Sequence, residues 1–169
     1  MSLSDNASQG PKPRVLVGGV GYRYLRDGAL GPYFSDRLER HATEDLEVED
    51  LSYHAVGLSQ NLQERPPYDR LVLVAAVNRG RPPGTVEAYR WDGALPERDA
   101  IQERVADAAM GSISLDTLLI VCGALGGLPD DVRVVEVEPA DEGWGEGFSP
   151  VIDAKLAEVE EKVWSFARP

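Results

Sequence analysis

The sequence predicts an α/β fold, a three-layer α/β/α sandwich around a mostly parallel sheet of about five strands. Short β-branched runs alternate along the chain with stretches that carry apolar residues at helical spacing. This order is typical of parallel sheets covered by helices on both faces. The most apolar run, residues 70–77, has apolar side chains in successive positions, as a central strand buried on both faces requires. The 169 residues, 43% of them hydrophobic, suffice for one domain with one core.

The first half of the chain is predicted to contain two further strands and two helices. Residues 14–19 form a β-branched run that ends in glycines, which indicates a buried first strand. Residues 30–41 carry apolar side chains at every fourth position, and Pro32 suits a first turn, so a helix is predicted there. Residues 46–52 alternate apolar and acidic residues, as a second strand does, and a short helix is expected over residues 57–63.

The second half adds two strands and two helices. Residues 85–91 alternate in the manner of an edge strand, whereas the mixed polarity of residues 93–110 predicts a loop with some helix. Ser114 fits the N-cap of a helix that runs to about residue 124. Residues 132–138 are predicted as the fifth strand. After a glycine-rich loop, Pro150 takes the first position of the last helix.

Composition excludes several classes of function. A net charge of −12 opposes binding to nucleic-acid phosphates, and no stretch approaches the roughly 18 apolar residues of a membrane span. Residues 1–13 are polar and lack the build of a signal peptide. We therefore expect a disordered leader, a single domain over residues 14–169, and a cytoplasmic location. The single cysteine, Cys122, lies in an apolar run and is expected to be a buried thiol.

Common nucleotide and hydrolase motifs do not fit the chain. Gly19 and Gly21 follow the first strand as in a dinucleotide-binding loop, but the bulky Tyr24 stands where the third glycine is needed. The sequence has no phosphate loop, nucleophile elbow or zinc-protease helix motif. Ligand sites of such sheets lie beyond the carboxyl ends of the strands. Of the two histidines, only His54 follows a predicted strand end, which makes it a candidate site residue.

Four blocks of the sequence together resemble a known family. Residues 19–31 read GVGYRYLRDGALG, where that family has G-[IV]-G-N-x-L-x-x-D-[DE]-G-[VI]-G. Residues 68–86 are similar to its middle strand and the following PPGTV, and residues 113–119 to a helix that a histidine precedes. Residues 138–150 resemble its I-E-P…W-G-x-x-L-S-P signature. In this order the blocks resemble the hydrogenase maturation proteases, peptidase family M52, and imply their phosphorylase/hydrolase-like sandwich.

The resemblance implies a nickel or zinc site whose ligands are missing here. Carried over by position, the three family ligands fall on Gly28, Ala75 and Gly111. None of these has a side-chain oxygen, nitrogen or sulfur to offer a metal. A one-residue slip would bring Asp27 to the first position but no ligand to the other two. Tyr22 also replaces the family's asparagine. No cofactor is therefore expected.

The leading hypothesis is a pseudoenzyme, a relative of the maturation proteases that has lost metal-dependent peptidase activity. It would keep the cleft and act as a binding or assembly protein for a hydrogenase large subunit, an assembly factor or a related partner. The predicted strand ends and the glycine-rich loop provide the candidate pocket. Its residues are Tyr22, Asp27, His54, Asn78 and Trp144.

Two other hypotheses stay open. One is an active endopeptidase that processes the C-terminus of the hydrogenase large subunit with nickel or zinc on relocated ligands. Those ligands would be drawn from Asp27, His54 and an acid such as Asp99 or Asp107. The other is a small-molecule binding module that uses the emptied pocket. Its aromatic lining would come from Tyr22, Tyr24 and Trp144.

Overall fold

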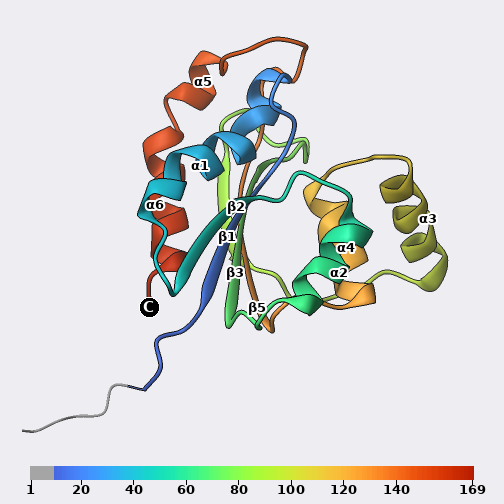
Figure 1. Cartoon of the computed structure of the whole chain (residues 1–169). Helices are drawn as coiled ribbons and strands as arrows, with labels where there is room; N and C mark the ends of the chain where they lie inside the picture. Colours follow the sequence, from blue (N-terminus) through green and yellow to red (C-terminus); the bar gives the residue numbers. More distant parts are fainter. Residues whose placement is uncertain (1–9) are drawn as a thin grey trace, which may run out of the picture.

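The computed structural model describes residues 10–169 and has one five-stranded sheet between two layers of helices (Figure 1). The strands are β1 (Val15–Val20), β2 (Leu46–Asp50), β3 (Arg70–Ala76), β4 (Val86–Arg90) and β5 (Asp131–Val137). Their order in the sheet is β2-β1-β3-β5-β4. Among these described strands, only β4 runs antiparallel to its neighbour. It pairs with β5 at one edge of the sheet. The predicted three-layer sandwich, with its central and edge strands, is confirmed.

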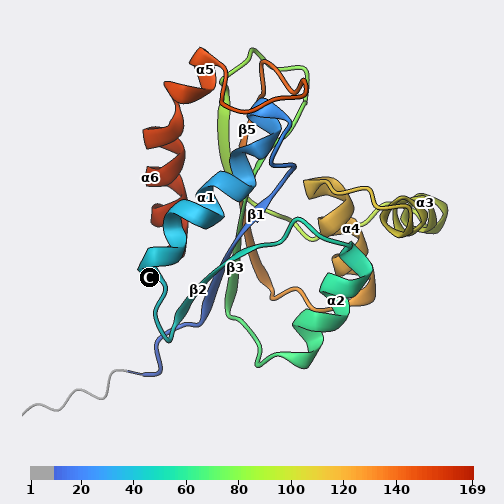
Figure 2. The same ribbon diagram turned by 45° about the horizontal axis from the view of Figure 1, so that its top comes forward.

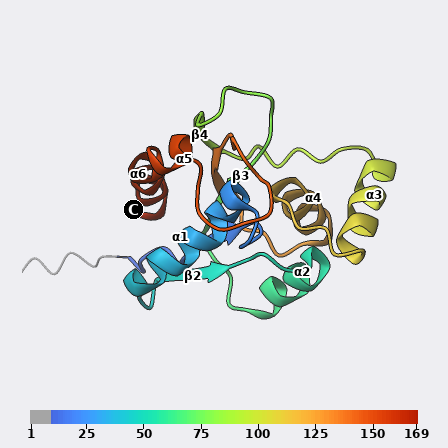
Figure 3. The same ribbon diagram turned by 90° about the horizontal axis from the view of Figure 1, so that it is seen from above.

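The helices form two layers and one outlying element. They are η1 (Arg26–Ala29), α1 (Leu30–Leu38), η2 (Glu39–His41), α2 (Ala55–Glu64), α3 (Arg98–Ala109), α4 (Leu115–Leu125), α5 (Pro150–Asp153) and α6 (Leu156–Ala167). Viewed from above, α1 and α6 cover one face of the sheet, and α2 and α4 cover the other (Figure 3). Helix α3 packs on the outer side of α2 and α4, away from the sheet.

Each face of the sheet has its own core, and β3 contributes to both. Leu71 and Leu73 point toward α2 and α4, whereas Val72 and Val74 point toward α1 and α6. All four are at most 1% exposed. Because successive side chains of a strand point to opposite faces, a strand covered on both sides must be apolar throughout. That requirement explains the uninterrupted apolar run.

Two glycines let α1 approach β1 closely. A Cβ at Gly19 would lie 2.0 Å from the Gly31 carbonyl oxygen, and one at Gly31 would lie 2.2 Å from the Val20 nitrogen. The Gly19 N–H donates to Ser35 Oγ at 3.0 Å across the same contact. This approach holds η1 and the start of α1 over the carboxyl end of β1.

Three helix predictions need correction. The predicted helix over residues 30–41 is α only to Leu38, after which a 3₁₀ turn follows. The last helix is interrupted between α5 and α6. Residues 93–110 contain a full helix, α3, where a loop with some helix is predicted. Good helix formers build α3, but only Ala108 is buried in it, so its sequence shows little apolar periodicity.

The remaining sequence expectations concern the leader, the membrane and the thiol. Residues 1–9 of the predicted leader lie outside the described residues, and residues 10–13 have no regular secondary structure. Across the described part of the chain, every helix is too short or too polar to cross a membrane. Cys122 is fully buried, as predicted. Burial raises the pKa of its thiol to about 12, so it stays protonated.

Candidate functional site

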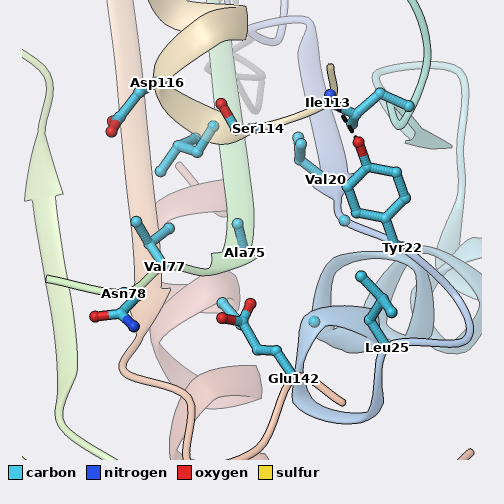
Figure 4. Close-up of a pocket in the computed structure, with 14 residues that line it drawn as sticks. Val20, Tyr22, Leu25, Ala75, Val77, Asn78, Ile113, Ser114, Asp116 and Glu142 are labelled. Atoms are coloured by element: carbon cyan, nitrogen blue, oxygen red, sulfur yellow. Dashed lines mark hydrogen bonds between the residues drawn. The ribbon is translucent and has the colours of Figure 1, made fainter. Parts of the chain in front are cut away.

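A cavity of about 290 Å³ opens where the carboxyl ends of β1 and β3 meet (Figure 4). It is lined by the loop and turn after β1, the end of β3, the N-terminus of α4 and the loop before α5. That last loop lies beside η1 at the same end of the sheet (Figure 2). Because parallel α/β sheets bind ligands at this end, the cavity is the candidate site.

Two of the three positions that the resemblance assigns to metal ligands face this cavity. Gly28 lies in η1, and a Cβ there would stand 3.2 Å from Leu25 Cβ and 3.5 Å from Glu142 Oε1. Ala75 is 2% exposed and lies near the end of β3. The sequence thus brings these two positions to one place, and neither carries a donor atom.

The third position, Gly111, does not line the cavity. It lies in the turn after α3 with a φ of +91°, and a Cβ there would meet nothing within 4 Å. Ile113 and Ser114 form this wall of the cavity instead. A side chain at position 111 would have to adopt a left-handed backbone conformation, which costs L-residues about 1–2 kcal/mol.

Two of the predicted pocket residues, Tyr22 and Asn78, line the cavity. The Ile113 N–H donates to the Tyr22 hydroxyl at 2.9 Å (Figure 4). This bond joins the loop after β1 to the segment before α4 across one side of the cavity. Asn78 Oδ1 accepts from the Gly80 N–H at 3.2 Å, which fixes the turn after β3.

Asp27 is predicted as a pocket residue but lies outside the cavity. Its carboxylate is fully buried and accepts four hydrogen bonds of 2.8 Å. The donors are the Ala140, Asp141 and Ser149 N–H groups and the Ser149 hydroxyl. Burial alone would raise the Asp27 pKa, but these bonds hold it below its usual value. Asp27 therefore fastens the loop before α5 to η1.

His54 and Trp144 also lie outside the cavity. The side chain of His54 caps α2, because its Nδ1 accepts from the Gly57 N–H at 3.2 Å. Trp144 is 80% exposed, and its ring centroid lies 5.9 Å from that of Tyr24. The acids on α3 proposed as relocated ligands do not line the cavity either. They are Asp99 and Asp107.

Sequence reasoning missed the carboxylate that does enter the cavity, that of Glu142 (Figure 4). Its carboxylate takes part in none of the hydrogen bonds or ion pairs found among residues 10–169. Burial, followed by the negative charges of Asp27 and Glu138, raises the pKa of Glu142 above its usual value. No sequence pattern distinguishes Glu142 from the other acids of its glycine-rich loop.

A second missed acid, Asp116, lines the opposite wall but is already paired. Arg79 donates to both of its carboxylate oxygens, at 2.8 and 2.9 Å. The same guanidinium donates to the buried Glu136, which also accepts from Arg81 and from the Tyr89 hydroxyl. This group of residues, the Glu136 cluster, joins β4, β5 and α4 behind the cavity and neutralises Asp116.

The donors around the cavity do not fit the metal that the resemblance implies. Gly28 and Ala75 offer none, Asp116 is held by Arg79, and Glu142 alone remains as a free carboxylate. Across residues 10–169, no three His, Cys, Asp or Glu side chains gather in a way that would hold a metal ion. Relocated ligands drawn from Asp27 and the two α3 acids are thus not brought together.

Comparison with known proteins gives likenesses in structure alone. No protein-family model and no curated protein sequence matches the chain. The hydrogenase maturating endopeptidase HybD from E. coli is 23% identical over 90% of each chain, with a TM-score of 0.67. A hydrogenase 2 maturation peptidase from a Thaumarchaeota archaeon is 22% identical over 90% of this chain and 97% of its own, with a TM-score of 0.61. The NiFe hydrogenase maturation protease HycI from Thermococcus kodakarensis is 16% identical over 92% of each chain, with a TM-score of 0.56. The chain therefore has the fold of the hydrogenase maturation endopeptidases.

Proposed function

We propose that this chain is a non-catalytic relative of the hydrogenase maturation proteases. It binds a segment of a hydrogenase large subunit, or of a related assembly partner, without metal-dependent cleavage. One observation carries the proposal. Gly28 and Ala75 face the same cavity at the carboxyl end of the sheet, where the resemblance places metal ligands, and neither has a donor atom.

The surroundings of the cavity support the loss of a metal site. Gly111 has no side chain and lies outside the cavity, so the third position offers no ligand either. The Arg79 guanidinium is bound to Asp116 on the opposite wall and neutralises the negative charge that this carboxylate would offer a metal. Tyr22 bridges to Ile113 along one side, in the place of the family's asparagine.

The size of the cavity suits a partner's side chain or a small metabolite. Pockets for small molecules usually enclose about 300–1,000 Å³, and this one, at about 290 Å³, lies at the lower limit. A single long side chain fits such a volume. The small-molecule alternative remains the second candidate because the cavity itself supports it, and a fragment screen followed by thermal shift would reveal it.

Metal content and cleavage test the proposal. The chain, dialysed against equimolar nickel or zinc and then desalted, should retain far less than about one metal ion per chain by mass spectrometry. A hydrogenase large-subunit precursor mixed with it should remain uncut and co-elute in size-exclusion chromatography. Retention of about one nickel per chain, or cleavage that a chelator stops, would overturn the proposal.

A variant that restores two donors sharpens the test. Gly28→Glu with Ala75→Asp places two carboxylates in the cavity, and the nearest atom to the new Cβ at position 28 is 3.2 Å away. Weak zinc or nickel binding should then appear in calorimetry. The matched control, Gly28→Gln with Ala75→Asn, keeps the volumes but lacks the charges and should bind no metal.

A further inference from the structure

We propose that α3 is a hinged cover that lifts off the outer face of α2 and α4 as a unit, while the sheet, the other helices and the cavity stay folded. The inference concerns a part of the molecule away from the cavity and does not depend on the proposed function. Three features carry it: the few contacts that hold α3, the anchors on either side of it, and the small surface beneath it.

The contacts of α3 are few. Viewed from above, it lies on the outer side of α2 and α4 (Figure 3). Ala108 is its one buried residue, and Ile101 and Val105 are partly buried. Among the hydrogen bonds and ion pairs of residues 10–169, a single one joins an α3 side chain to another element, from Arg104 Nη1 to Thr117 Oγ1 at 3.5 Å. An element with so little buried apolar area and hydrogen bonding opens at low cost.

The sequence of α3 gives the helix little stability of its own. It has 12 residues, and isolated helices of this length are marginal in water. Asp99 and Glu103, and again Glu103 and Asp107, place like charges four residues apart, which destabilises a helix. Once it is lifted from α2 and α4, α3 therefore melts, and its amide hydrogens become accessible to solvent.

The chain is anchored on both sides of α3. Before the helix, Trp91 and Leu95 rest on α4 at Gly123, where a Cβ would lie 2.9 Å from Trp91 Cη2 and 3.0 Å from Leu95 Cδ2. After the helix, the Ile113 N–H donates to the Tyr22 hydroxyl at 2.9 Å, and the Ile113 side chain packs against the core between the sheet and α4. An opening of α3 stops at these two anchors, so the cavity wall that Ile113 forms stays in place.

A short exposed connection lies between each anchor and α3. Residues 96–97 lead into the helix, and residues 110–112 lead out of it. Gly111 has a φ of +91°, and a Cβ there would meet nothing within 4 Å, so its backbone has both the freedom and the space to turn. Hinges are short connections of this kind at the ends of a moving element. The position where the resemblance places the third metal ligand therefore serves as a hinge.

The surface beneath α3 is small and apolar. Ala55 of α2 and Val121 of α4 are buried, and with Ala108 they form a core cluster separate from the two cores of the sheet. Val56 packs against this cluster. Opening of α3 uncovers the cluster and leaves both cores of the sheet covered, because α2 and α4 contribute to the sheet's core through other side chains. The rest of the domain therefore keeps its fold while α3 is open.

Thiol labelling under native conditions tests the cover. In Ala108→Cys the new thiol lies at a fully buried position beneath α3, and a small alkylating reagent reaches it only when α3 lifts. Cys122 is also fully buried, but in the core against the sheet, so its labelling reports global unfolding. We expect the thiol at position 108 to be labelled at least about a hundredfold faster than Cys122, because local opening costs less than global unfolding. Equal rates at the two positions would overturn the inference.

Hydrogen exchange of the unaltered chain locates the ends of the moving unit. The hydrogen-bonded amides of α3 should exchange together, about a hundredfold faster than those of α2 and α4. The Ile113 amide, bonded to Tyr22, should stay protected with α4. Exchange of α3 at the rate of α4, or exchange of Ile113 at the rate of α3, would contradict a cover that moves between the two anchors.

A matched pair of variants separates a cover from a helix that the fold requires. Ala108→Asp places a carboxylate beneath α3, whereas Ala106→Asp places one on its exposed side. In Ala108→Asp the exchange of α3 should become at least about tenfold faster while the rest of the domain stays folded, because α3 opens rather than bury the charge. Ala106→Asp should behave like the unaltered chain. Loss of the whole fold in Ala108→Asp alone would show that α3 is integral to the domain.

Discussion

Asp27 lies close to the candidate site, but its carboxylate stabilises the fold and does not face the cavity. Its carboxylate is fully buried, yet both oxygens accept hydrogen bonds from the segment that leads into α5. A buried carboxylate is tolerated only when its oxygens are bonded in this way. By fastening that segment to η1, Asp27 also sets the loop from which Glu142 enters the cavity. Its influence on the site is therefore indirect.

We predict that Asp27→Ala lowers the free energy of unfolding by about 3 kcal/mol, because three backbone N–H groups lose their acceptor. The control is Asp36→Ala. Asp36 is an exposed partner of Arg23, and such pairs contribute about 0–1 kcal/mol. Urea denaturation measures both losses. Similar small losses in the two variants would contradict the structural role assigned to Asp27.

At the scale of elements, the contact between β1 and α1 decides where the cavity lies. Backbone meets backbone there, so no side chain can adapt to an added methyl group. The new Cβ of Gly31→Ala would lie 2.2 Å from the Val20 nitrogen, and α1 would have to move away from the sheet. The strand end, η1 and the cavity wall that η1 forms would move with it.

We therefore expect Gly31→Ala to destabilise the chain by about 3 kcal/mol. Gly57→Ala is the matched control, because the nearest atom to its Cβ is 4.0 Å away and the residue lies within α2. That change should stabilise the chain by about 0.5–1 kcal/mol, as alanine does in helices. Thermal unfolding followed by circular dichroism should show shifts of opposite sign, and shifts of the same sign would be inconsistent with the close contact.

The elements that can be predicted are those whose own residue pattern shows which of their faces are buried. Strand β3 is apolar on both faces because helices cover both, and this makes it evident in the sequence. Helix α3 packs against other helices and buries one residue, so periodicity reveals little of it. The break between α5 and α6 is equally hidden, because Ile152 and Val159 pack into one core from either side of it.

The cavity was predictable in place but not in composition. Tyr22 and Asn78 follow the ends of β1 and β3, and the rule that sites lie beyond carboxyl strand ends is enough to find them. Glu142 lies on a loop whose course depends on the bonds that Asp27 makes to distant backbone. His54 follows a strand end as well, yet its ring is used as a helix cap. The position of a residue after a strand end cannot show whether its side chain lines the cavity or caps a helix.

Across the whole molecule, paired carboxylates make stability dependent on pH. Burial opposes ionisation of Asp27, Asp131 and Glu136, but their hydrogen bonds and ion pairs hold each pKa below its usual value. A lowered pKa in the folded state contributes stability at neutral pH that is lost as pH falls through that pKa. Glu142, with its raised pKa, has the opposite sign. The groups with a lowered pKa outnumber Glu142, so the chain should lose stability in acid.

The Glu136 cluster connects this behaviour to the site. Glu136 is 3% exposed and is shared by Arg79 and Arg81, and Arg79 in turn holds Asp116 beside the cavity. Replacing it with glutamine leaves two guanidinium groups without their shared anion. We predict that Glu136→Gln lowers the free energy of unfolding at neutral pH by about 3 kcal/mol.

This deficit should begin to shrink as pH falls below 4.5, the ordinary glutamate value, because Glu136 then becomes protonated in the unfolded chain while it stays ionised in the folded one. It should close once pH falls below the lowered pKa of Glu136 in the folded chain. Urea midpoints at a series of pH values measure the difference. Glu87→Gln, an exposed partner of Arg81, should give a small difference that hardly depends on pH. If the Glu136→Gln deficit were constant with pH, lost shape rather than lost charge would explain it. A deficit that closes in acid would show that the negative charge of Glu136 stabilises the packing of β4, β5 and α4 behind the cavity.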